Sequence, residues 1–221
     1  MEITAVQEGT GRCEAFSDGI FAIAATLLVL ELRLPNAGVE ANLRDELVAL
    51  WPSYLAFALS FFVILVTWVG HHDLMRLVRG TSRLFLMANG FAGFYVAFVP
   101  FPTAVLAANL AGPNIRTAVA FYCGTFVLGN VSVNLLLAAI MHDQLFRPEV
   151  DERAIARARR ALRLGFVISV AATALALVLP WLALALCVAL RLYWLRLRYG
   201  PAQSTTPSHQ SSKEKSVLVN R

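Results

Sequence analysis

Charged side chains are scarce in this sequence. Only 15% of its 221 residues are Asp, Glu, Lys or Arg, whereas 58% are hydrophobic. A soluble domain carries about 25% charged residues. The composition, with a mean hydropathy of +0.64, therefore predicts a membrane protein with several spans. A net charge of +5 could suggest nucleic acid, but the arginines cluster between the apolar runs. We interpret the charge as a topology signal and expect no nucleic-acid partner.

Metal-ligand spacings and catalytic motifs are also missing. The three cysteines, Cys13, Cys123 and Cys187, lie far apart in the sequence and are expected to be buried free thiols. The sequence contains no GxSxG, HExxH or Walker motif. We therefore predict that the protein is not an enzyme and has neither a cofactor nor a metal site. It also has no TVGYG sequence, so any ion selectivity must come from something other than a carbonyl filter.

Apolar runs of about 20 residues predict six membrane helices. They lie near residues 14–34, 48–74, 84–108, 115–142, 160–179 and 181–198. The last two could instead be one kinked span, because Pro180 interrupts a single apolar run. Six spans place all Lys and Arg residues except Arg33, Arg44 and Arg116 on one side, whereas five spans split them 10 to 9.

The predicted fold is thus an all-α membrane protein with six transmembrane helices per chain over residues 1–199. Both termini are expected in the cytoplasm, with a disordered tail over residues 200–221. Within the spans, Pro100 and Pro102 predict a kink in the third helix. Small and polar residues predict close helix approach and interhelical hydrogen bonds. These residues are Gly90, Gly93, Gly124, Gly129, Asn130, Ser132 and Asn134.

The first predicted helix carries an acid, Asp18, near its inner end. A carboxylate inside a membrane helix costs about 2.5–3.5 kcal/mol on insertion scales, so it should have a partner. The end of the second helix and the start of the third lie at the same depth and offer polar groups. We therefore expect an inner polar network that packs the helices together, although direct contact with ions is an alternative. Its members would be Arg12, Phe16, Ser17, Asp18, Trp68, His71, His72 and Asn89.

The adjacent histidines His71 and His72 raise the hypothesis of a metal site. Neighbouring residues on a helix point about 100° apart, so this pair cannot easily chelate one ion. A role in sensing pH is open, because histidine titrates near neutrality.

An aliphatic stripe runs along the same first helix. At about 100° per residue, Ile23, Leu27 and Leu30 share one face, whereas Asp18 points about 140° away from Ile23. By pattern alone the stripe favours lipid contact or core packing over a pore. At the outer end, Glu31, Glu40, Asp45 and Glu46 outnumber Arg33 and Arg44. This acidic mouth would concentrate cations.

The start of the first predicted helix resembles a known signature. It consists of Arg12, three further residues, FSDG and an apolar run ending in LLVLE. The signature is that of the first membrane helix in the endosomal and lysosomal potassium channel family (transmembrane protein 175), in its short bacterial form. The resemblance implies that the first helix lines a central pore and that Ile23, Leu27 and Leu30 form its constriction.

FSD occurs once in this sequence, whereas a two-repeat member of that family would carry it twice. A single copy implies that a central pore is assembled from several chains. Because two-repeat members of the family assemble as pairs, the resemblance implies a homotetramer. The implied function is a potassium-preferring channel for monovalent cations, in contact with lipids of a bacterial inner membrane. Two alternatives stay open: a proton-coupled secondary transporter, and a non-transporting membrane scaffold.

Overall fold

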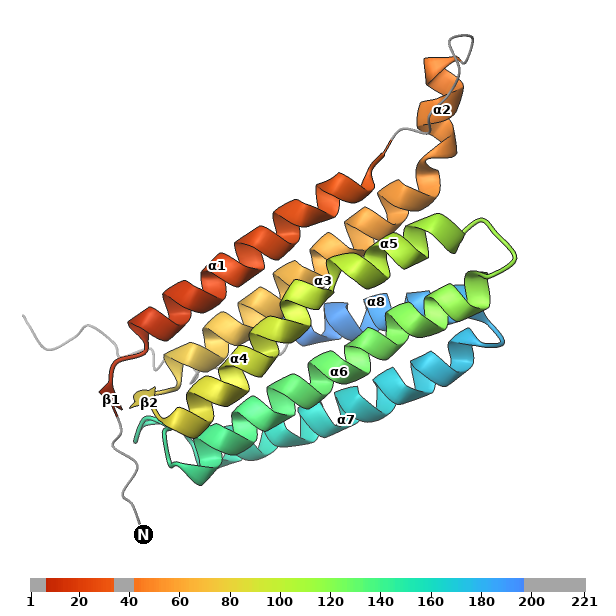
Figure 1. Ribbon diagram of the computed structural model, residues 1–221. Helices are drawn as coiled ribbons and strands as arrows, with labels where there is room; N and C mark the ends of the chain where they lie inside the picture. Colours follow the sequence, from red (N-terminus) through yellow and green to blue (C-terminus); the bar gives the residue numbers. More distant parts are fainter. Residues whose placement is uncertain (1–6, 34–41, 197–221) are drawn as a thin grey trace, which may run out of the picture.

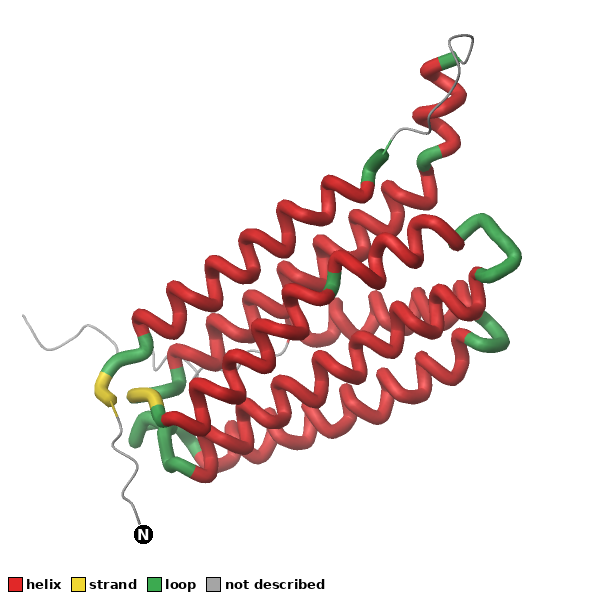
Figure 2. Tube along the Cα trace, in the orientation of Figure 1, coloured by secondary structure: helices red, strands yellow, loops and turns green. Residues whose placement is uncertain are grey.

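The computed structural model describes residues 7–33 and 42–196, which form a bundle of long helices (Figure 1). Most of the described chain is helical (Figure 2). The helices are α1 (Gly11–Leu27), continued by the 3-10 turn η1 (Leu28–Glu31), α2 (Leu43–Ala49), α3 (Trp51–Arg76), α4 (Arg83–Phe98), α5 (Pro100–Asn109), α6 (Ile115–His142), α7 (Glu152–Ala176) and α8 (Pro180–Arg196). Two short strands, β1 (Gln7–Glu8) and β2 (Gly80–Thr81), pair at one end.

The prediction of a mostly helical membrane protein is confirmed. Within the described residues, four helical segments are long and apolar enough to cross a membrane. They are Gly11–Glu31, Trp51–Arg76, Arg83–Asn109 and Ile115–His142. The two remaining predicted spans coincide with α7, whose first half is rich in arginine, and with α8, which has 17 residues. Length and composition alone therefore do not establish α7 and α8 as spans.

Prolines set two of the helix boundaries. Pro100 opens α5 directly after Val99, so the third apolar run is divided into two helices at the place where a kink was predicted. Proline lacks an N–H and its ring clashes with the preceding turn, so it fits only at the start of a helix. Pro180 likewise opens α8 after a short turn. The run of residues 164–190 is therefore a helical hairpin, with α7 and α8 packed side by side (Figure 1).

Main-chain pairings tie the loops together at the end of the bundle where α1 begins. β1 pairs antiparallel with β2, and Val78 forms a bridge with Phe146. Ser82 caps α4 by accepting a hydrogen bond from the Phe85 amide (3.1 Å), and its hydroxyl also donates to the Asp143 carboxylate. That bond and a second one with His142 lower the pKa of Asp143. The linker between α3 and α4 is thus held against the end of α6.

The core of the bundle contains polar links as well as apolar packing. Thr103 donates to Ser60 (2.7 Å), and Ser60 is bonded to the Tyr122 hydroxyl (3.0 Å), which joins α5, α3 and α6. Asn130 donates to Ser169 across the α6–α7 contact (2.9 Å). Such bonds add to packing inside a membrane because lipid offers no substitute partner. By contrast, the hydroxyl of Ser132 and the amide of Asn134 donate to carbonyls of α6 itself, so the interhelical prediction is wrong for those two.

Close helix approach involves two of the four predicted glycines. A Cβ at Gly129 would lie 2.5 Å from Cζ of Tyr95, and one at Gly93 would lie 2.8 Å from Cδ1 of Ile20. Position 129 therefore requires glycine for α6 to meet α4, because the rigid Tyr95 ring fills the space. At Gly93 the clashing atom is the end of the flexible Ile20 side chain, which can shift. Gly90 and Gly124 have no such contact within the described chain.

Candidate functional site

A chain of buried hydrogen bonds joins α1, α4 and α3 near the end where α1 begins. The Asn89 side-chain amide donates to the Ser17 hydroxyl (2.9 Å), and its carbonyl oxygen lies 2.8 Å from Nε2 of His71. Ser17 is 4% exposed and Asn89 3%. Because the Asn89 carbonyl oxygen can only accept, His71 must donate from Nε2. One asparagine therefore connects the first helix to both of its neighbours.

A second contact lies beside this chain. Nε1 of Trp68 donates to Oδ1 of Asp18 at 2.8 Å, and the Trp68 ring stacks on His72 with centroids 5.9 Å apart. Asp18 thus has the partner that an acid in an apolar helix needs, and the partner belongs to α3. The predicted network therefore brings six of its residues together: Ser17, Asp18, Trp68, His71, His72 and Asn89.

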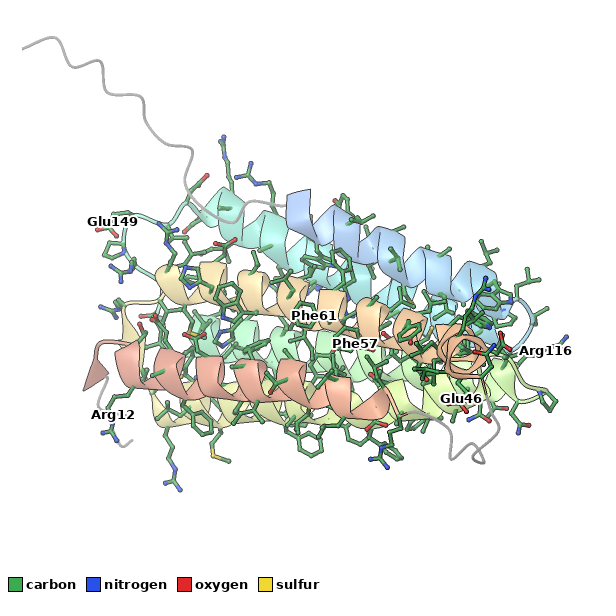
Figure 3. The ribbon with its side chains drawn as sticks, turned by 90° about the horizontal axis from the view of Figure 1, so that it is seen from above. Arg12, Glu46, Phe57, Phe61, Arg116 and Glu149 are labelled. Atoms are coloured by element: carbon green, nitrogen blue, oxygen red, sulfur yellow. The ribbon has the colours of Figure 1, made fainter. Side chains whose placement is uncertain are left out.

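Arg12 and Phe16 do not join this group within the described chain. Phe16 is 61% exposed. Arg12 lies in the first turn of α1, and its side chain points away from the bundle (Figure 3). The described residues also contain no group of three or more His, Cys, Asp or Glu that could hold a metal ion.

The other face of α1 is uncovered within one chain. Cys13, Ser17, Phe21 and Ala24 are buried against the bundle. Ile23, Leu27 and Leu30 lie outside this buried face and are 61%, 42% and 57% exposed. Figure 1 shows α1 at one edge of the bundle, with α7 at the opposite edge. The predicted stripe therefore forms an open face and does not belong to the chain's own core.

The spacing of this stripe depends on the 3-10 turn at the end of α1. From Ile23 to Leu27, four residues at about 1.5 Å give about 6 Å along the axis. Leu30 lies inside η1, where the rise is about 2 Å per residue, so it follows Leu27 by about 6 Å as well. The three side chains are thus regularly spaced.

Acidic residues gather at the far end of α1. Glu31 closes η1 and is half-buried, and Asp45 and Glu46 lie in the first turn of α2. Glu46 and Arg116 lie at this end of the bundle, whereas Arg12 and Glu149 lie at the other (Figure 3). Glu40, the remaining acid of the predicted mouth, is outside the described residues.

Sequence patterns did not single out Tyr95 or Arg191, which meet inside the bundle. Tyr95 is 2% exposed, and the Arg191 guanidinium lies 4.8 Å from the centroid of the Phe126 ring. In the charge count of the sequence, Arg191 is only one of the positive residues near the last predicted span. The available signal was its position three residues before the end of the apolar helix Pro180–Trp194, because an arginine there must be accommodated by protein.

Comparison with known proteins gives consistent similarities. Residues 12–100 match the family described as endosomal/lysosomal potassium channel TMEM175. The chain is 41% identical over 191 residues to a protein of Chamaesiphon minutus named as a potassium channel, covering 85% of this chain and 94% of that protein. It is 36% identical over 205 residues to a Streptomyces collinus protein also named as a potassium channel, covering 92% and 97%.

A solved structure agrees with these matches. The crystal structure of a lysosomal potassium-selective channel TMEM175 homolog from Chamaesiphon minutus is similar with a TM-score of 0.76 at 40% identity. The similarity covers 87% of this chain and 98% of that one.

Proposed function

The chain belongs to the TMEM175 family of ion channels, and on that premise we propose that it conducts potassium through a pore lined by α1. A member of this family is a channel and not an enzyme. Its similar bacterial proteins are named potassium channels. In this proposal the permeant ion is K⁺, and no cofactor takes part.

The observation that carries the proposal is the open aliphatic face of α1. In a channel built from several copies, a helix at the edge of each bundle can turn such a face toward a common axis. Rings of Ile23, Leu27 and Leu30 would then narrow the pore. Bulky aliphatic rings exclude water and oppose ion passage until they widen, which supports a gate of this kind.

Four copies are the stoichiometry we propose. The signature around Phe16, Ser17 and Asp18 occurs once per chain, so a fourfold pore needs four chains around one axis. We further propose six spans per chain, with α7 and α8 crossing as a short hairpin. The arginines in the first half of α7 would reach the inner surface, because long charged side chains can extend along apolar surroundings to water.

The inner polar contacts are proposed to hold α1 in place and not to bind ions. Ser17 and Asn89 are almost completely buried, and Asp18 is already paired with Trp68. Groups satisfied in this way are suited to fixing the position of the pore helix. The acids around Glu31 would instead attract cations at the outer mouth.

Liposome flux tests the proposed function directly. With a potassium gradient and no pH gradient, we expect cation flux that is larger for K⁺ than for Na⁺, since potassium gives up its hydration water more easily. Flux that appears only with an imposed pH gradient would instead support the proton-coupled transporter. Protein that is assembled but supports no flux would support the scaffold.

Cysteine labelling from outside the cell tests the proposed orientation, in which both termini lie in the cytoplasm of a bacterial inner membrane. In a background without Cys13, Cys123 and Cys187, a cysteine at Gly38 should react with an impermeant maleimide. A cysteine at Ser211 should react only after the membrane is opened. The reason is that 16 of the 19 Lys and Arg residues fall on one side in this arrangement. Labelling of Ser211→Cys in intact cells would rule out six spans.

A further inference from the structure

A cavity of about 300 Å³ lies within one chain, apart from the open face of α1. Its walls come from the last turns of α3, the middle of α4, the second half of α6, the charged half of α7 and the end of α8. This volume is at the lower end of the range for small-molecule sites, about 300–1,000 Å³. Most of the wall is apolar, with a few polar side chains at defined places.

Two neighbouring groups in this wall, the Tyr95 hydroxyl and the Arg191 guanidinium, have no acceptor other than the tyrosine oxygen itself among the contacts of the described residues. The Tyr95 hydroxyl is completely buried and has no hydrogen-bond partner among the described residues. The guanidinium of Arg191 is near enough to act on the Tyr95 oxygen both as a charge and as a hydrogen-bond donor, although no well-formed bond joins the two groups. No carboxylate in the described chain forms an ion pair with Arg191, whose recorded contact is the face of the Phe126 ring.

An arrangement of this kind is costly unless something completes it. Arginine stays protonated at any physiological pH, and a charge at membrane depth is normally paired. A buried hydroxyl without a partner costs about 1–3 kcal/mol. Both groups share one cavity, so a single acceptor placed there would satisfy both.

The acid in the wall, Asp73, lies far from this pair. It is three residues before the end of α3, whereas Tyr95 is twelve residues beyond the start of α4 at the same end of the bundle. At about 1.5 Å per residue the two levels differ by about 13 Å along the axis. The cavity therefore has a cationic donor end deep in the bundle, an apolar middle and an acid near the inner surface.

We propose that this cavity binds a small organic anion, with an aromatic or hydrocarbon body ending in a carboxylate, sulfonate or phosphate group. The anionic oxygens would accept hydrogen bonds from Tyr95 and Arg191, and the body would lie along apolar residues such as Leu136 and Leu137. Charge-assisted bonds to a guanidinium are stronger than neutral ones, which favours an anion over an alcohol. The exposed arginines of α7, among them Arg157 and Arg160, would draw anions toward the entrance.

An occupant of this cavity would touch the network that seats the first helix. His71 and Phe21 belong to the cavity wall, and their rings lie 5.6 Å apart. His71 is also bonded to Asn89, which is bonded to Ser17 of α1. Binding can be measured without ion flux, so its failure would be distinct from failure of the proposed channel function.

Two fluorescent probes with the same ring body test the proposal. 8-Anilino-1-naphthalenesulfonate carries a sulfonate, and N-phenyl-1-naphthylamine lacks it. With the full-length protein in phosphatidylcholine nanodiscs, and empty nanodiscs subtracted, we expect one sulfonate-probe site per chain. Arg191→Gln should weaken that binding at least tenfold and Tyr95→Phe about threefold to fivefold. Binding of the neutral probe should stay within twofold in both variants.

Matched variants guard against misfolding and surface binding. Arg163→Gln and Tyr193→Phe change exposed residues that do not line the cavity, so both should bind the sulfonate probe normally. Arg191→Lys keeps the charge and should recover part of the affinity. Ala158→Phe narrows the cavity and should weaken both probes. Adding phosphatidylglycerol should displace the sulfonate probe only if lipid headgroups are the natural source of the anion.

Three outcomes would overturn the proposal. Equal loss of both probes in Arg191→Gln would show that the charge does not select the ligand. One site per assembly, in place of one per chain, would put the probe in the shared pore. Binding seen only after truncation following Arg196 would mean that the C-terminal residues of this chain fill the cavity themselves.

Discussion

Replacing Leu27 with alanine is expected to raise potassium flux about threefold to tenfold and to admit larger monovalent cations. In the proposed pore the side chain is the middle one of three rings, and a smaller ring holds more water around the ion. A tenfold increase corresponds to a barrier lower by about 1.4 kcal/mol. Flux of K⁺, Na⁺ and Cs⁺ through reconstituted protein measures both effects.

Companion variants locate the narrowest ring. Ile23→Ala and Leu30→Ala should act in the same direction, and the largest change identifies the tightest level. Val29→Ala is the matched control, because Val29 is exposed at 51% on the same helix but does not belong to the stripe. If the three stripe variants assemble normally and leave flux and ion preference as in the parent, the stripe packs against lipid or a neighbouring chain and the pore lies elsewhere.

Much of the fold could be predicted from the apolar runs and from the prolines that interrupt them. Each predicted apolar run coincides with a helical segment, and Pro100 and Pro180 begin helices where their missing N–H is tolerated. The ends of helices were less predictable. α1 begins at Gly11 and not near residue 14, shortly after the strand β1 that pairs with β2. Pairings between distant segments leave no periodic pattern in the sequence.

The contacts of the candidate site were predictable where two polar side chains had to pair because they lie at the same depth in the membrane. Asp18 required a donor at its own level, and Trp68 and the Asn89 chain were the polar groups available there. Arg12 was assigned to the same network by depth alone, but the direction of its side chain depends on where α1 begins. Tyr95 and Arg191 were missed because their neighbours come from helices far apart in sequence. Gly129 makes room for the Tyr95 ring, but a glycine in the sequence does not indicate which side chain will pack against it.

Replacing Asn89 with leucine is expected to destabilise the assembled protein more than any other single change in the inner network. The substitution removes two bonds at once and leaves Ser17 and His71 without partners in a nearly dry site. An interhelical hydrogen bond in a membrane protein contributes about 0.6 kcal/mol on average, whereas a buried group left unpaired costs about 1–3 kcal/mol. We expect the second effect to dominate, and a total loss of about 2–4 kcal/mol. Thermal unfolding in detergent and the fraction of intact oligomer after extraction measure it.

Asn109→Leu provides the matched control, because its side-chain amide donates only to the Val105 carbonyl of its own helix. That variant should unfold within a few degrees of the parent. Asp18→Ala extends the comparison to the second contact: losing the bond from Trp68 should weaken assembly while the preference for K⁺ over Na⁺ is kept. If Asp18→Ala assembles like the parent but loses its ion preference, the carboxylate faces the permeating ion. In that case the partner on α3 positions the carboxylate for ion contact and does not merely hold the helix.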